Sequence, residues 1–321
     1  MSFRQGQKQA RPRTMMILLS VLVSAAVLAG CSSEPTASGL TDPNAAWQGG
    51  ATEASAAPNS SQSGVKNIAG WALPLDEFVP EFSNLDNYAE QLLLASCLSQ
   101  KNIAWPVPWQ DIDEPTSPVF NPTGRRLFNL EIAKKYGFRT NLAPSKSAQL
   151  WETFLTYQPT EPGFQDAFDT CLDGIRAEHP LVSSEDTMFV NALIAQIQEQ
   201  AFQDSAVQEA AGRWRSCMEP QGLGQLPENP NEFPSLELQG ELGAVPPVKT
   251  VEPSARELDV AVAHATCLDS SGFSAAMYEK EWELQETAIE RERTKLDAIR
   301  DAVQARQAAV KEIIAANAPK A

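Results

Sequence analysis

Residues 97–103 are Cys-Leu-Ser-Gln-Lys-Asn-Ile, and the same spacing recurs at 217–223, Cys-Met-Glu-Pro-Gln-Gly-Leu, and at 267–273, Cys-Leu-Asp-Ser-Ser-Gly-Phe. In each stretch a Gly or Asn follows the cysteine by five residues. These residues favour the left-handed conformation that ends an α-helix, and the apolar residue after them packs back on the one that follows the cysteine. We therefore expect three helices that each carry a cysteine near their end, with Pro220 ending the second slightly early.

The cysteines predict two disulfides. Apart from Cys31, the chain has Cys97, Cys171, Cys217 and Cys267. An even number is typical of disulfides in an exported chain, and four cysteines allow three pairings. We favour Cys97–Cys171 and Cys217–Cys267, because each would tie neighbouring helices within one half of the chain. Free buried thiols are the alternative.

Apolar residues at helical spacing predict further helices, and no long stretch alternates apolar and polar residues as a strand would. Helices are expected to begin at Ser83, at Gly163, at Ser183 or Ser184, and at Ser254, and a further helix is expected to contain Val207, Ala211, Trp214 and Met218. Two proline-rich stretches, 101–127 and 221–253, are expected to be long irregular loops. The predicted class is all-α, a disulfide-stapled helical domain with long irregular Pro-rich loops and a long C-terminal helix.

The terminal helix is predicted as one element over 274–317. Apolar residues fall every seven positions along it, at Trp282, Ile289, Leu296, Val303 and Val310. This fills one seam position of a coiled coil, but the second position also holds Gln285, Glu292 and Arg306, and a coiled coil needs both positions apolar. The stripe is expected to pack on its own domain, with an interface for another protein as the alternative.

Trp105 and Trp109 lie in the first proline-rich stretch and flank Pro106-Val107-Pro108. Such side chains can stack on a sugar or a peptide. They can also pack the loop onto the helices, which is the more common arrangement. We keep both as candidate interface residues.

The N-terminus has the composition of a signal peptide. Four basic residues precede the apolar stretch 15–27, which is too short to span a membrane as a helix. Leu28-Ala29-Gly30-Cys31 follows, and it resembles the lipobox of bacterial lipoproteins, which implies cleavage before Cys31 and a diacylglyceryl group on its sulfur. The alternatives are a soluble secreted protein with an incidental cysteine, or an uncleaved anchor.

These features divide the chain into three parts. Residues 1–30 are the expected signal peptide, and residues 31–65, rich in Ser, Ala, Gly and Pro, are the expected disordered tether. Residues 66–321 are the expected helical domain. It has two halves that resemble each other, 66–180 and 181–273, followed by the terminal helix.

Charge excludes some partners. Of 25 Lys and Arg residues four lie in the leader, so the mature chain has 21 against 41 Asp and Glu, a formal charge of −20. Nucleic acids are bound through basic residues, so no nucleic-acid partner is expected.

Catalytic motifs are absent from the sequence. The two histidines, His179 and His264, are far apart, and no zinc, phosphate-loop or nucleophile-elbow motif occurs. His264 lies one helical turn before Cys267, a spacing that suits a metal, but a disulfide at Cys267 would prevent ligation. No catalytic residue, cofactor or metal is expected.

Several short motifs resemble a known family. Trp71-Ala72-Leu73-Pro74-Leu75-Asp76, the Cys97-Leu98 helix end, Tyr136-Gly137-Phe138, and Trp214 with Cys217-Met218 occur in this order, followed by the long terminal helix. Together they resemble uncharacterised secreted lipoproteins of actinobacteria. The resemblance implies a lipid anchor, a helical fold and a single-membrane envelope, and it implies no activity.

The expected function is therefore that of a non-enzymatic accessory or binding protein on the extracytoplasmic face of the cell membrane. Its membrane contact would be the lipid on Cys31, and its partner an envelope protein or a cell-wall component. The alternative is a solute-binding lipoprotein of a transporter, which predicts strands alternating with helices in two lobes. A secreted hydrolase is the third possibility.

Overall fold

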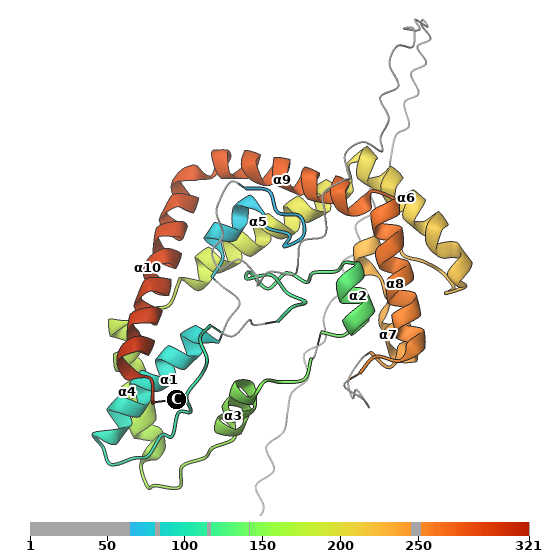
Figure 1. Ribbon diagram of the computed structural model, residues 1–321. Helices are drawn as coiled ribbons and strands as arrows, with labels where there is room; N and C mark the ends of the chain where they lie inside the picture. Colours follow the sequence, from blue (N-terminus) through green and yellow to red (C-terminus); the bar gives the residue numbers. More distant parts are fainter. Residues whose placement is uncertain (1–64, 81–83, 114–116, 141, 245–251, 321) are drawn as a thin grey trace, which may run out of the picture. The chain divides into compact units, whose positions relative to one another are not determined.

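The computed structural model describes residues 65–80, 84–113, 117–140, 142–244 and 252–320, all within one unit, 56–321. Across these residues the chain forms ten α-helices and no strand, apart from two isolated β-bridges (Figure 1). The predicted all-α class is confirmed. The helices are α1 (Leu85–Ser99), α2 (Leu130–Tyr136), α3 (Lys146–Leu155), α4 (Phe164–Glu178), α5 (Ser184–Phe202), α6 (Ser205–Met218), α7 (Leu236–Leu242), α8 (Ala255–Ser270), α9 (Phe273–Arg291) and α10 (Arg293–Asn317), with 3-10 turns η1 (Pro74–Phe78), η2 (Glu219–Gln221) and η3 (Pro230–Glu232).

Both disulfides have the favoured pairing. Cys97–Cys171 joins α1 to α4 with the two Cα atoms 6.0 Å apart, and Cys217–Cys267 joins α6 to α8 with 5.6 Å between the Cα atoms. The bridges close segments of 74 and 50 residues. Each bridge therefore ties two helices that pack against each other but lie far apart in sequence.

The first cysteine helix ends in the cap that its sequence predicts. Asn102 has φ +62°, and its N–H donates to the Ser99 carbonyl at 3.0 Å. The N–H of Ile103 donates to the Leu98 carbonyl at 3.0 Å, and both side chains are buried in one cluster. These are the two hydrogen bonds and the apolar contact of a Schellman cap.

The other two cysteine helices end by variations on this cap. Helix α6 stops at Met218, before Pro220, and a 3-10 turn carries the chain to Gly222 at φ +63°. After α8, Gly272 has φ +73°, and the Ser271 hydroxyl donates to the Leu268 carbonyl and accepts from the Phe273 N–H.

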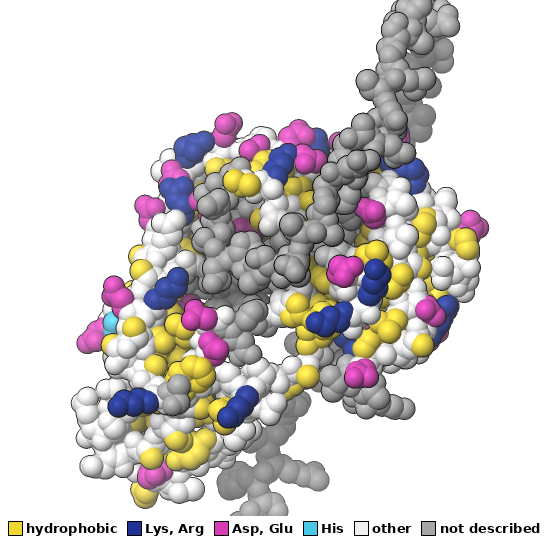
Figure 2. Space-filling model, viewed as in Figure 1, with side chains coloured by type: hydrophobic (Ala, Val, Ile, Leu, Met, Phe, Trp, Pro, Cys, Tyr) yellow, Lys and Arg dark blue, Asp and Glu magenta, His cyan; other side chains and the backbone are white. Residues whose placement is uncertain are grey.

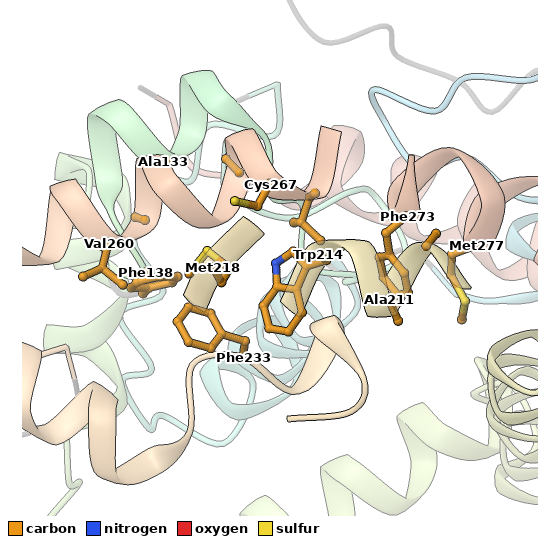
Figure 3. Close-up of a cluster of buried hydrophobic side chains, with 14 of the residues drawn as sticks. Ala133, Phe138, Ala211, Trp214, Met218, Phe233, Val260, Cys267, Phe273 and Met277 are labelled. Atoms are coloured by element: carbon orange, nitrogen blue, oxygen red, sulfur yellow. The ribbon is translucent and has the colours of Figure 1, made fainter. Parts of the chain in front are cut away.

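Trp214 is at the centre of the largest hydrophobic cluster. Its side chain is fully buried, and Figure 3 shows it on α6 between Phe233 and residues of α8 and α9. Phe138, after α2, and Met218, at the end of α6, belong to the same cluster. This core joins helices α2, α6 and α8 to the start of α9.

The C-terminal helices cover the rest of the domain. Leu296 and Val303 of α10 pack with η1 and α5, and Val310 packs with Tyr88 of α1 and Trp151 of α3. The stripe of apolar residues thus packs on its own domain, as the favoured interpretation predicts.

The prediction of one unbroken helix over 274–317 is wrong at a single residue. Glu292, with φ −103° and ψ 16°, separates α9 from α10 (Figure 1). Helix α9 packs on α5, α6 and α8, whereas α10 packs on α1. The break allows the two halves of the apolar stripe to follow different parts of the core.

Three short helices, α2, α3 and α7, were not predicted. Helix α2 begins after Asn129, whose Oδ1 accepts from the Ile132 N–H. Helix α3 begins after Ser145, whose Oγ accepts from the Ala148 N–H, and α7 begins after Ser235, whose Oγ accepts from the Leu238 N–H. Helix α7 lies within 221–253, so this stretch is not the uninterrupted loop that its prolines predicted. Serine caps of this kind are strong helix starts.

None of the described helices has the length and hydropathy needed to cross a membrane. The expected signal peptide, Cys31 and nearly all of the expected tether lie outside the described residues. On the face of the molecule seen in Figure 2, acidic and basic side chains are interspersed, with hydrophobic side chains between them.

Candidate ligand-binding site

A cavity of about 590 Å³ lies beside the Trp214 core. It is lined by the end of α5, by residues of α8 and α9, and by two connecting segments, 125–128 and 229–233. Small-molecule sites commonly have volumes of about 300–1,000 Å³. The cavity therefore has a size that suits a small organic ligand.

His264 of α8 forms part of the cavity wall, although only 4% of its surface is exposed. Its Nδ1 accepts a hydrogen bond of 3.1 Å from the indole Nε1–H of Trp214. Because an indole nitrogen can only donate, Nδ1 carries no proton. The proton of the neutral ring is therefore on Nε2.

Aromatic rings surround the imidazole. The ring centroids of Phe233, Phe128, Trp214 and Phe138 lie 4.8, 5.0, 5.5 and 6.1 Å from that of His264. This burial, with the positive charge of Arg126, lowers the pKa of His264 to about 3. The ring is thus neutral at any physiological pH, and its tautomer is fixed.

The Nε2–H of His264 has no hydrogen-bond partner among the described residues. It is not among the enclosed polar atoms that lack a partner, so Nε2 keeps access to solvent, and the ring lines the cavity. Water can therefore accept from this donor until a ligand replaces it. The cavity therefore presents one oriented donor to whatever occupies it.

Apart from His264 and two arginines, the wall is half apolar and half polar. Its apolar side chains are Phe128, Phe202, Pro230, Phe233, Leu268 and Met277. Gln203, at the end of α5, and Asn231 are exposed lining residues.

Two arginines line the cavity and differ in their pairing. Arg125 makes a two-pronged ion pair with the buried Glu281, with 2.7 Å between Nη2 and Oε1. Arg126 donates from Nη2 to the Phe138 carbonyl at 2.9 Å, and no carboxylate of the described residues pairs with it. Arg126 is therefore a cation beside His264 whose charge is not neutralised by an ion pair.

A buried ion pair positions Phe138 against His264. Arg139 and Glu257 are 4% and 0% exposed, with Nη2 and Oε2 3.0 Å apart, and Glu257 Oε1 also accepts from the Phe138 N–H at 3.1 Å. Gly137, the residue before Phe138, has φ +57°, and a Cβ there would be 2.6 Å from Glu257 Oε1. The Tyr-Gly-Phe element thus has a structural reason for its glycine.

The Leu-Pro-Leu-Asp element places the carboxylate of Asp76 where it interacts electrostatically with the other arginine, Arg125. Asp76 accepts from the Leu73 N–H at 2.9 Å and from the Thr123 hydroxyl at 3.2 Å. Burial raises the pKa of Asp76 to about 6. The guanidinium of Arg125 lies 4.9 Å from the centre of a ring of Trp71, a residue held at φ +45°.

The tryptophans of the first loop are placed differently from each other. Trp105 packs among Phe154, Phe164 and Phe168, and its Nε1–H donates to Gln91 at 2.9 Å. Trp109 is 38% exposed. Trp105 therefore fastens the loop to the domain, and Trp109 alone is open to a partner.

The candidate interface on the terminal helix requires correction. Trp282, Leu296, Val303 and Val310 are between 0% and 6% exposed, and Ile289 is half-buried against the same core. These side chains are occupied by their own domain and offer no docking surface in this structure.

The sequence pointed to His264 only as an improbable metal partner of Cys267. Cys267 is in a disulfide, and among the described residues no cluster of potential metal ligands occurs. The signal that could have identified the site is an isolated histidine on the apolar face of a helix. Arg126 gave no signal, because its neighbours come from distant segments.

Comparison of the chain with family models, with curated proteins and with solved structures finds no match.

Proposed function

We propose that this chain is a lipid-anchored, extracytoplasmic binding protein that holds a small molecule in the cavity at His264. The proposed location at the membrane rests on the composition of residues 1–30 and on Leu28-Ala29-Gly30-Cys31. Two acyl chains on one cysteine would be sufficient for stable membrane attachment, whereas one chain binds only marginally. The ligand assignment rests on the cavity.

The single observation that supports binding is the orientation of His264. Its Nδ1 is occupied by Trp214, while its Nε2–H lacks a partner among the described residues and keeps access to solvent, in a ring that lines the cavity. Such a donor can be satisfied by water or by a ligand. An oriented donor beside apolar side chains is an arrangement that ligand sites use to fix the pose of a ligand.

Binding is favoured over catalysis by the composition of the wall. Among the described residues that line it there is no Ser, Thr, Cys or Lys to act as a nucleophile. A histidine with a pKa of about 3 stays neutral near pH 7, so it is a poor proton shuttle. These features support a non-enzymatic role.

The transporter alternative receives less support. A two-lobed solute-binding fold needs parallel strands with helices on their faces. The described residues form helices and two isolated bridges. A helical domain can still bind a solute, but it would do so with an architecture of its own.

The cavity can be tested by blocking its mouth. Gln203 lines the cavity and is exposed, while Gln208 of α6 is exposed and lies outside the wall. Gln203→Trp places an indole at the mouth, and Gln208→Trp is the matched control because the two glutamines share one weak hydrogen bond of 3.4 Å. Thermal unfolding is measured with fractions of small molecules extracted from the producing cells.

A fraction that raises the Tm of the wild type and of Gln208→Trp, but not of Gln203→Trp, supports the proposal. Equal shifts in all three proteins, or no shift with any fraction, would contradict the proposal. The anchor is tested separately with Cys31→Ser in cells, which should move the protein from the detergent-rich phase to the aqueous phase on phase separation.

A further inference from the structure

The polar groups of the cavity identify the chemical class of its occupant. We propose that the ligand is a small organic carboxylate with an apolar body, whose carboxylate lies between Arg126 and the Nε2–H of His264. This assignment rests on the proposed function and adds the nature of the ligand.

His264 requires an acceptor. Because Trp214 donates to Nδ1 and the ring is neutral, Nε2 can donate but cannot accept. The ligand atom that meets it must carry a lone pair. An ammonium or an amide N–H at this position would leave two donors facing each other.

Arg126 requires a negative charge. Its guanidinium lies 5.4 Å from the centre of the Phe128 ring, and that ring centre lies 5.0 Å from that of His264, so both groups border the same part of the wall. Its one hydrogen bond within the described residues is to a backbone carbonyl. The neighbouring Arg125 is already neutralised by Glu281. A carboxylate can accept from the guanidinium with one oxygen and from the imidazole with the other.

The acidic residues of the wall do not remove this preference. Glu199 and Glu232 line the cavity and are exposed, as Arg126 is. The charges of all three are screened by water and salt, whereas the hydrogen bond that His264 offers comes from a side chain that is 4% exposed. The donor of His264 therefore fixes where the carboxylate lies, and Arg126 adds a guanidinium that no carboxylate of the described residues pairs with.

The apolar side of the cavity predicts the rest of the ligand. Phe233, Leu268 and Met277 are buried wall residues, and Phe128 stacks on Phe138 with ring centroids 5.5 Å apart. A cavity of about 590 Å³ has room for an aryl or alkyl chain beside the carboxylate.

The test compares each acid with its uncharged analogue. Phenylbutyrate and decanoate are titrated into the full mature protein by calorimetry, beside phenylbutyramide and decanamide. We expect each carboxylate to bind about 10- to 100-fold more tightly than its amide, the value of a hydrogen bond to a charged group. Arg126→Gln should remove this difference.

Arg256 supplies the matched control. It is exposed near the start of α8, donates one side-chain hydrogen bond to a backbone carbonyl, and is absent from the cavity wall. Arg256→Gln therefore removes the same formal charge and should retain the carboxylate preference. Equal loss in both variants would show a general charge effect and overturn the assignment.

Nitrogen NMR of the two histidines gives a second readout. In protein labelled with ¹⁵N-histidine, phenylbutyrate should shift the Nε2 resonance of His264 and leave His179, which is outside the cavity, unchanged. Amides that bind as tightly as acids, with the His264 shift retained, would overturn the carboxylate and leave the cavity function intact. If neither class binds or shifts His264, the carboxylate proposal is wrong, and the extract experiment decides whether the cavity binds anything else.

Discussion

The indole Nε1–H of Trp214 donates to Nδ1 of His264 over 3.1 Å, joining α6 to α8 inside the core. The disulfide between Cys217 and Cys267 joins the same two helices, one turn further along each. The covalent bridge and the hydrogen bond thus fix the helix pair together, and the hydrogen bond also selects the tautomer that faces the cavity.

Replacing Trp214 with Phe tests this relationship. The variant keeps most of the buried ring but leaves His264 Nδ1 without its donor. We expect the free energy of unfolding to fall by about 1–3 kcal/mol, the cost of an unsatisfied buried group together with lost packing. Trp109→Phe, at a 38%-exposed site, should change stability by less than about 0.5 kcal/mol.

The two variants should also differ in the tautomer of His264. In the wild type, ¹⁵N shifts should report protonation at Nε2 only, whereas Trp214→Phe frees the ring to protonate at either nitrogen. An unchanged tautomer in Trp214→Phe would show that the surrounding aromatic rings, and not the hydrogen bond, orient the imidazole.

His264 and Asp76 should have opposite effects on the pH dependence of stability. The pKa of His264 is lowered from 6.5 to about 3 on folding, so its contribution is complete above pH 6.5 and is lost as the pH falls towards 3. The pKa of Asp76 is raised from 3.8 to about 6, so the folded state gains stability as the pH falls from 6 towards 3.8. Between pH 7 and 5 the two effects largely cancel.

Asp76→Asn removes the stabilisation that protonation of Asp76 provides at low pH and leaves the effect of His264. Asn can still accept from the Leu73 N–H, but it does not titrate. On going from pH 7 to 5 the variant should lose about 1 kcal/mol more stability than the wild type, measured by urea unfolding. The exposed Asp113→Asn is the control. If Asp76→Asn and the wild type lose the same stability, Asp76 does not titrate in this range.

The helical architecture could be predicted from local signals, but its long-range contacts could not. Helix ends such as Asn102 are coded within a few residues, and the disulfide pairing follows from placing neighbouring helices together. The break at Glu292 has no local breaker and comes from the different surfaces that α9 and α10 cover.

The candidate site illustrates the same limit. His264 and Trp214 are 50 residues apart, and Arg126 lies far from both in sequence. Nothing near any of these residues indicates that a cavity joins them. Similarly, the stripe from Trp282 to Val310 was visible, but whether it covers its own domain or another protein depends on the tertiary structure.

Gly137 should tolerate no side chain. Its φ of +57° disfavours any L-residue, and a Cβ would be 2.6 Å from Glu257 Oε1. We expect Gly137→Ala to lower the free energy of unfolding by about 2–4 kcal/mol, combining backbone strain with displacement of a buried carboxylate. Gly174→Ala, in helix α4 with open space around it, should instead stabilise by about 0.5–1 kcal/mol. Equal effects of the two substitutions in chemical denaturation would contradict this account.

The buried pair of Arg139 and Glu257 should be far more sensitive to substitution than pairs on the surface. Removing the arginine leaves Glu257, fully buried, with the Phe138 N–H but without its cation. We expect Arg139→Met to cost about 3–5 kcal/mol in urea unfolding. Lys134→Met is the matched control, because it breaks an exposed pair with Glu131 and should cost less than about 0.5 kcal/mol. Since Glu257 also holds Phe138 against His264, Arg139→Met should shift the ¹⁵N resonances of His264, and Lys134→Met should not. A loss of stability without that shift would mean that the ion pair supports the core but not the cavity.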